Sequence, residues 1–122
     1  MPTRRALVIE DDPVTARLEE SLLTQDDYAV DRVADGHGAI ERLAAQRYDV
    51  IVLDVGLPDV DGYEVAQQLR TAGPNQRTPV VVVTGSTDPT ARRRGFEAGA
   101  VVFIAKPFTA EQFRALVGTV VA

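Results

Sequence analysis

The sequence predicts an α/β domain in which five parallel strands form one sheet with helices on both faces. Two observations lead to this fold class. Four apolar runs rich in β-branched residues recur at residues 6–9, 50–53, 80–83 and 101–104. Continuous apolar runs of this kind are typical of strands buried on both faces, as in a parallel sheet. Segments with helical spacing lie between them, so strand and helix alternate five times, and the crossovers should be right-handed.

Shorter patterns predict the remaining elements. Residues 29–33 alternate apolar and charged side chains, which suits a strand at the edge of the sheet. Thr109 followed by Gln112 resembles a capping box at the start of the last helix. The apolar stripes of the predicted helices contain Leu18 and Leu22; Ala39, Ile40, Leu43 and Ala44; Val65 and Leu69; and Phe113, Leu116, Val117, Val120 and Val121.

Length and composition indicate one globular domain. The 122 residues, 45% apolar and 25% charged, suit a single domain over residues 1–122 with a core at about 5–120 and no output domain in this chain. The absence of cysteine excludes a disulfide framework and a thiol nucleophile, and the single histidine excludes a His-rich metal site. Apolar stretches are too short for a membrane span or a secretory signal, so we expect a cytoplasmic protein.

The charge distribution argues against nucleic-acid binding. The formal net charge is −5, and fourteen of the eighteen acidic residues lie between Glu10 and Asp61. A negative domain lacks a general attraction to phosphate backbones. The basic cluster Arg92–Arg94 is interpreted as a solvated helix face.

Polar residues follow four of the predicted strands, and the carboxyl ends of parallel strands are where ligand sites form. Asp12 before Pro13 also fits a helix cap. Asp54 does not, because it ends an apolar strand and the next helix begins only at about Gly62. The residues expected at this edge are Glu10, Asp11 and Asp12; Asp54; Thr84 and Gly85; and Lys106 and Pro107.

Crowded carboxylates repel one another, so a cation is expected among them. Oxygen ligands without Cys or His favour a hard divalent ion, and a few carboxylates with water suit Mg²⁺ better than Ca²⁺. Mg²⁺ and Lys106, the sole lysine, could neutralise a phosphoryl group while Thr84 donates a hydrogen bond to it. Asp54 would then supply the nucleophilic oxygen and become an aspartyl phosphate.

The same residues carry a family resemblance. Glu10-Asp11-Asp12 after the first strand, Asp54 through Pro58 with Asp61-Gly62, Thr84-Gly85 and Lys106-Pro107 stand in the order found in response regulator receiver domains of bacterial two-component systems. The match runs from about Arg5 to Val120. It implies a doubly wound, flavodoxin-like (βα)5 fold with strand order 2-1-3-4-5.

The resemblance also implies a function in a phosphorelay. A sensor histidine kinase or a histidine phosphotransfer protein would phosphorylate Asp54. Asp11, Asp54 and the carbonyl of Gly56 would hold Mg²⁺, with Glu10 acting through a water molecule. Thr84 and Lys106 would contact the phosphoryl group, and the Lys106–Pro107 peptide bond would be cis. The chain would be a signalling phosphoacceptor rather than an enzyme, with weak autophosphorylation and autodephosphorylation activity.

Signal output is implied by the same resemblance. Thr84 would move toward the phosphoryl group, and Phe103 would turn inward as the aromatic switch residue, which changes the face formed by the fourth helix, fifth strand and fifth helix. This face would serve a downstream protein, an attached output domain or a phosphorylation-dependent homodimer. Gly56 and Ser86 lack bulk near Asp54, so we expect a short-lived phosphorylated state.

Two other function classes remain. The first is a receiver-like scaffold that binds partners whatever its phosphorylation state. The second is an enzyme on a similar fold. Dehalogenase-type phosphatases place a second Asp where this chain has Gly56, a flavodoxin-like phosphate loop would be repelled by Glu10-Asp11-Asp12, and no P-loop occurs.

Overall fold

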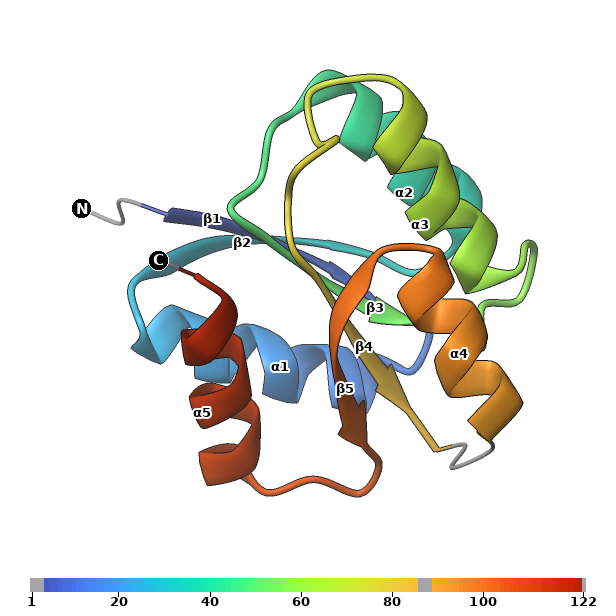
Figure 1. Ribbon diagram of the computed structural model, residues 1–122. Helices are drawn as coiled ribbons and strands as arrows, with labels where there is room; N and C mark the ends of the chain where they lie inside the picture. Colours follow the sequence, from blue (N-terminus) through green and yellow to red (C-terminus); the bar gives the residue numbers. More distant parts are fainter. Residues whose placement is uncertain (1–3, 86–88, 122) are drawn as a thin grey trace.

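A computed structural model describes residues 4–85 and 89–121, and Ser86 therefore lies outside the described residues. Strand and helix alternate along this part of the chain (Figure 1). The elements are β1 (Arg4–Ile9), α1 (Pro13–Gln25), β2 (Tyr28–Val33), α2 (Gly36–Ala45), β3 (Val50–Asp54), α3 (Gly62–Thr71), β4 (Val80–Thr84), α4 (Pro89–Glu97), β5 (Ala100–Ala105) and α5 (Ala110–Val120).

The five strands form one parallel sheet in the order β2-β1-β3-β4-β5, which confirms the predicted fold class. β2 lies at an edge, as its alternating sequence predicts. The expectation that residues 101–104 are buried on both faces is wrong in part, because β5 forms the other edge and Val101 is 50% exposed. A β-branched apolar run does not distinguish an interior strand from an edge strand that a helix covers on each side.

Two separate apolar cores lie on the two faces of the sheet. Successive strand residues point to opposite faces, so Leu7 and Ile9 of β1 enter one core while Ala6 and Val8 enter the other. Helices α2, α3 and α4 cover the first face, and α1 and α5 cover the second (Figure 1). The sheet is therefore the middle layer of three.

The buried face of α1 differs from the predicted stripe. Leu22 is buried as expected, but Leu18 is 44% exposed. The residues of α1 that face the sheet are Ala16, Glu19, Leu22 and Leu23. The stripe prediction was wrong at Leu18 because an acidic residue, Glu19, occupies the inward position next to it. The predicted helix ends are confirmed by the Asp12 cap with Pro13 in the first turn and by the capping box of Thr109 and Gln112.

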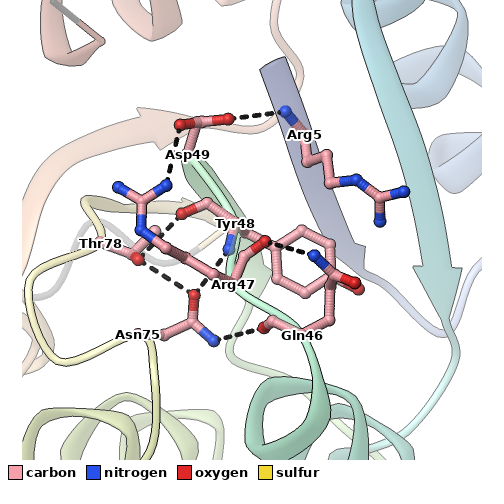
Figure 2. A network of polar contacts seen from close by, with 7 residues as sticks. All are labelled: Arg5, Gln46, Arg47, Tyr48, Asp49, Asn75 and Thr78. Atoms are coloured by element: carbon pink, nitrogen blue, oxygen red, sulfur yellow. Dashed lines mark hydrogen bonds and ion pairs between the residues drawn. The ribbon is translucent and has the colours of Figure 1, made fainter. Parts of the chain in front are cut away.

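Buried polar groups at the amino ends of the strands are held by one asparagine (Figure 2). The Asn75 side chain donates to the carbonyl oxygens of Leu43 and Gln46 at 2.8 and 2.7 Å. It accepts from the Tyr48 backbone N–H at 2.8 Å, and the Thr78 hydroxyl lies 3.0 Å from its oxygen. Asn75 therefore joins the loop after α2 to the loop after α3.

No helix in the described part of the chain is long and apolar enough to cross a membrane.

Candidate phosphoacceptor and metal site

Parallel pairing brings the predicted site residues to one edge of the sheet. Ile9 of β1 pairs with Leu53 of β3, so Glu10 and Asp54 follow paired positions on neighbouring strands. Thr84 ends β4 and pairs with Ala105 of β5, the residue before Lys106. Glu10 and Lys106 are 96 residues apart in the sequence, and the strand order β1-β3-β4-β5 brings them to the same edge of the sheet.

Three carboxylates form the centre of the site. Glu10, Asp11 and Asp54 each offer one oxygen, and these atoms lie within 4.8 Å of one another. Glu10 and Asp54 are buried, at 3% and 8% exposure, whereas Asp11 is exposed. We call these three residues the acid cluster. Its geometry leaves one side open to solvent and to an incoming ion.

Lys106, the residue after β5, reaches the acid cluster. Its Nζ lies 3.2 Å from Glu10 Oε2 and 3.4 Å from Asp54 Oδ2. The Lys106 backbone N–H donates to the Thr84 carbonyl oxygen at 2.8 Å, which fixes the start of the lysine stem beside β4. The Lys106–Pro107 bond is cis, as predicted.

Burial and mutual repulsion shape the charges of the site. The pKa of Glu10 is raised to about 7, mainly by burial and then by the nearby Asp54 charge, while Lys106 partly offsets both effects. Burial alone would lower the pKa of Lys106, but the negative charges of Asp54 and Glu10 outweigh it and raise that pKa. One ammonium group thus compensates the acid cluster incompletely near neutral pH.

Backbone groups orient the two buried carboxylates. The Gly56 N–H donates to Asp54 Oδ1 at 3.1 Å, and the Asp12 N–H donates to Glu10 Oε1 at 3.2 Å. Gly56 is exposed, and a Cβ placed on it would meet only the Asp54 oxygen, at 3.6 Å. A side chain at position 56 would therefore stand over the Asp54 carboxylate.

The loop between β3 and α3 is tied to three helices. Asp59 accepts from the Gly36 and His37 backbone N–H groups of α2 at 2.8 and 3.0 Å. Asp61 caps α3 and forms an ion pair with Arg94 of α4. Arg92, Arg93 and Arg94 are all exposed, which confirms the predicted solvated helix face, and the ion pair of Arg94 with Asp61 is an additional contact that the sequence did not predict.

Phe103 lies beneath α4, partly buried. Its ring contacts Phe96 edge-on with centroids 4.8 Å apart. Gly95 makes room for it, because a Cβ at this position would stand 2.2 Å from Phe103 Cζ. The pairing of Phe103 with Val82 puts it on the same face of the sheet as Thr84, two residues along β4.

Sequence analysis missed one residue near the site. Glu19 of α1 is 1% exposed, and neither carboxylate oxygen has a hydrogen-bond partner. The sequence contains one indication of this position: Ala16, Glu19 and Leu23 have helical spacing, which places them on one face of α1. An acidic residue at an inward position is easily passed over when only apolar residues are counted.

Comparison with known proteins decides the family. Residues 6–118 match the response regulator receiver domain. The chain belongs to the response regulator receiver family. It is 33% identical over 114 residues to the response regulator ArlR of Staphylococcus haemolyticus, covering 93% of this chain and 51% of that protein. It is 40% identical over 110 residues to the transcriptional regulatory protein TcrA of Mycobacterium tuberculosis, covering 88% of this chain and 42% of that protein.

A solved receiver domain has the same fold. The receiver domain of a sensor histidine kinase from Pseudomonas aeruginosa PAO1, with a magnesium ion coordinated in its active-site cleft, superimposes with a TM-score of 0.87. The two chains are 31% identical, and the match covers 96% of each. The present chain spans about half the length of the curated relatives it matches. It is thus a receiver domain of response regulators, with an acid cluster that could bind a metal.

Proposed function

We propose that this receiver domain accepts a phosphoryl group on Asp54 from a phosphohistidine, in a Mg²⁺-dependent reaction. The observation that carries the proposal is the position of the sole lysine. Its ammonium group lies 3.4 Å from the Asp54 carboxylate within a group of three acids. This arrangement places an ammonium group beside a buried carboxylate, where it can also contact an incoming phosphoryl group.

The donor set of the acid cluster fits Mg²⁺. Asp11 and Asp54 would hold the ion together with the Gly56 carbonyl, and Glu10 would act through a bound water. All of these donors are oxygens, which a small hard cation prefers. The similar receiver domain from Pseudomonas aeruginosa has magnesium in its cleft. When bound, the ion neutralises phosphoryl oxygens and draws the acids together.

Three side chains would carry the transfer. An Asp54 oxygen forms a bond to phosphorus while the bond from phosphorus to the imidazole nitrogen of the donor breaks. Lys106 leaves part of its contact with Asp54 and pairs with a phosphoryl oxygen. Thr84, at the end of the neighbouring strand, donates its hydroxyl hydrogen to another.

An apolar groove beside Lys106 suits the phosphohistidine donor. Thr15 and Leu18 of α1 and the Lys106–Phe108 segment line a groove of about 350 Å³. Val14, one turn away from Leu18, is 75% exposed. Exposed apolar side chains around a charged centre are typical of an interface for a helix of a partner protein. We assign this surface to the kinase or to a histidine phosphotransfer protein.

The output would pass through Thr84 and Phe103. Movement of Thr84 toward the phosphoryl group frees space on the face of β4 that Phe103 shares. A change in the Phe103 ring alters its packing on Phe96 and Gly95, and with it the face formed by α4, β5 and α5. This face would bind a downstream protein, an attached output domain or a second phosphorylated copy. Direct nucleic-acid binding is not part of this role.

The phosphorylated state would be short-lived. Gly56 leaves the approach to Asp54 open to water, and a side chain can be added there without contact other than the 3.6 Å to Asp54. The domain would thus catalyse its own dephosphorylation without turning over a separate substrate. Phosphate release from the phosphorylated protein should be complete within minutes to an hour or so, and several-fold slower in Gly56→Asn. A lifetime of many hours in the unmodified protein would contradict this.

Within the longer proteins it resembles, residues 1–122 would act as a single receiver domain in the cytoplasm. The acid cluster, Lys106 and Thr84 all lie within the family match, so this unit contains the groups that the transfer uses.

Acetyl phosphate and Mg²⁺ test the proposal by intact-mass spectrometry. The unmodified protein should gain one phosphoryl group, Asp54→Asn should gain none, and a chelator should prevent the gain. Asp27→Asn is a matched control, because Asp27 lies beyond α1 at a φ of 67° that asparagine also adopts. An unmodified protein that stays unphosphorylated while still binding a kinase would favour the scaffold function instead.

A further inference from the structure

The start of α2 is capped by two acidic residues from different parts of the chain. A helix leaves its first backbone N–H groups without partners inside the helix. Asp35, the residue before α2, accepts from the Gly38 N–H at 2.7 Å, as a local cap does. Asp59, from the loop between β3 and α3, accepts from the Gly36 and His37 N–H groups at 2.8 and 3.0 Å. The cap of α2 is thus completed by the loop that follows β3.

This loop fits closely against α2. Gly36 makes room for it, because a Cβ at this position would stand 1.9 Å from Val60 Cγ2. Both oxygens of Asp59 have a second partner: Oδ1 accepts from the Val60 N–H at 3.0 Å, and Oδ2 lies 2.5 Å from His37 Nδ1. The hydrogen bonds from Gly36 and His37 lower the pKa of Asp59 to about 2, so this side chain is ionised at neutral pH. Asp59 therefore fixes the middle of the loop to the start of α2.

The same loop contacts the proposed phosphoacceptor. Its two ends are joined, because the Gly62 N–H donates to the Val55 carbonyl oxygen at 3.3 Å, and a Cβ at Gly62 would stand 2.5 Å from Val55 Cα. Within the loop, the Gly56 N–H donates to Asp54 Oδ1 at 3.1 Å. Gly56 is exposed, and glycine has the widest backbone freedom of any residue. Contacts made elsewhere in the loop therefore have to hold Gly56 in place if this hydrogen bond is to persist.

We propose that Asp59 is a positioning residue for Asp54: by capping α2 it holds the loop in the place from which Gly56 donates to the Asp54 carboxylate. The proposal rests on the proposed function of Asp54 as phosphoacceptor and Mg²⁺ ligand. The other acid of the loop, Asp61, caps α3 and pairs with Arg94, so it fixes the end of the loop beside α3. Asp59 supplies the attachment to α2, on the opposite side of the loop from α4.

Asp59→Ala and Asp35→Ala form a matched pair of variants, because each removes one carboxylate from the cap of α2. Both should lower the unfolding temperature, by about 4 °C. Only Asp59→Ala should speed hydrogen exchange of the Gly56 amide several-fold, measured by NMR without Mg²⁺. Only this variant should also raise the Mg²⁺ dissociation constant measured by calorimetry, by about tenfold, as removal of a group that orients a metal ligand commonly does. In Asp35→Ala that constant should stay within about twofold of its value in the unmodified protein.

Two further variants separate the cap from its surroundings. His37→Ala keeps the His37 backbone N–H that Asp59 binds, so Gly56 exchange and Mg²⁺ affinity should be unchanged. Asp59→Asn keeps one oxygen for the Gly36 N–H, so its effects should have the same direction as those of Asp59→Ala and be smaller. If Asp59→Ala does not fold, Asp59→Asn carries the same test.

Three outcomes are decisive. If Gly56 exchange and Mg²⁺ affinity in Asp59→Ala and Asp59→Asn match those of Asp35→Ala, Asp59 only stabilises α2 and the proposal is wrong. An effect of His37→Ala as large as that of Asp59→Ala would assign the role to the imidazole and would also overturn the proposal. If the unmodified protein binds no Mg²⁺, the proposed function is wrong, while Gly56 exchange still decides whether Asp59 holds the loop.

Discussion

Buried polar groups are fully paired at the amino ends of the strands and incompletely paired at the carboxyl ends. At the amino ends, Asn75 bonds to the Gln46 carbonyl, the Tyr48 N–H and the Thr78 hydroxyl (Figure 2) and also to the Leu43 carbonyl, all within 3.0 Å. At the carboxyl ends, Glu10 and Asp54 are buried with one shared ammonium group, and Glu19 behind them has no hydrogen-bond partner. The first arrangement is complete within the protein. The second is incomplete, and under the proposed function it would gain stability from a bound cation.

This difference explains how one small domain can be both stable and responsive. A fully paired polar network rigidifies the loops it joins, so the amino end holds the sheet in register. Uncompensated acids destabilise the folded state and make it sensitive to any cation or phosphoryl group that changes their charge. The end with the proposed site is therefore the end at which the protein's own groups do not fully compensate the buried acidic charges.

The largest expected change is a decrease in the free energy of unfolding as pH rises, measured in the presence of a chelator. The folded-state pKa values of Glu10 and Glu19 are raised from 4.5 to about 7 and about 8, so their contribution to stability is complete below pH 4.5 and is lost as pH rises from there through the raised values. The free energy of unfolding should fall by about 1.4 kcal/mol per pH unit for each proton involved.

Urea unfolding at pH 5, 6, 7 and 8 measures this decrease. The lowered pKa of Asp59, about 2 because of its hydrogen bonds to the Gly36 and His37 N–H groups, affects stability only at lower pH. A free energy of unfolding that is constant or rises between pH 5 and 8 would show that the acids of the carboxyl end are compensated after all. Saturating Mg²⁺ should weaken the decrease.

Asn75→Ala should give the next largest effect, at the other end. It leaves the Tyr48 N–H and the carbonyls of Leu43 and Gln46 without their partner, so we expect a loss of about 3 kcal/mol in the free energy of unfolding. Mg²⁺ affinity should be unchanged in the folded protein. Gln76→Ala serves as the control, because that exposed side chain makes one long contact, and it should cost less than about 0.5 kcal/mol.

One pair of identical substitutions compares the two ends directly. Thr78→Val should lower the free energy of unfolding by about 1 kcal/mol, because the buried hydroxyl lies 3.0 Å from the Tyr48 carbonyl. It should leave the rate of phosphorylation by acetyl phosphate unchanged. Thr84→Val should slow that rate about tenfold, the value of one hydrogen bond to the phosphoryl group. Equal rates of phosphorylation in the two variants would show that Thr84 does not contact the phosphoryl group.

Much of the fold and of the site could be predicted from the sequence. Apolar runs and the alternating residues 29–33 predicted the strands, and helical spacing predicted α1, α2, α3 and α5, because burial on a sheet depends mainly on local patterning. Helix α4 followed only from the regular alternation of strand and helix. Glu10, Asp54 and Lys106 met at one edge because parallel strands place their ends together. The exposure of Val101, the ion pair of Arg94 and the inward position of Glu19 could not be read in this way. Each depends on which element packs beside it, which is a property of the whole fold.

Magnesium titration of the unmodified protein tests the central claim most directly. The claim is that Lys106 alone does not compensate the acid cluster and that a divalent cation completes the compensation. Followed by calorimetry at pH 8, it should show one Mg²⁺ bound per chain and a rise in unfolding temperature at saturation. Asp54→Asn should bind the ion much more weakly. A protein whose unfolding temperature is the same with and without Mg²⁺, and which takes up no ion, would contradict the account.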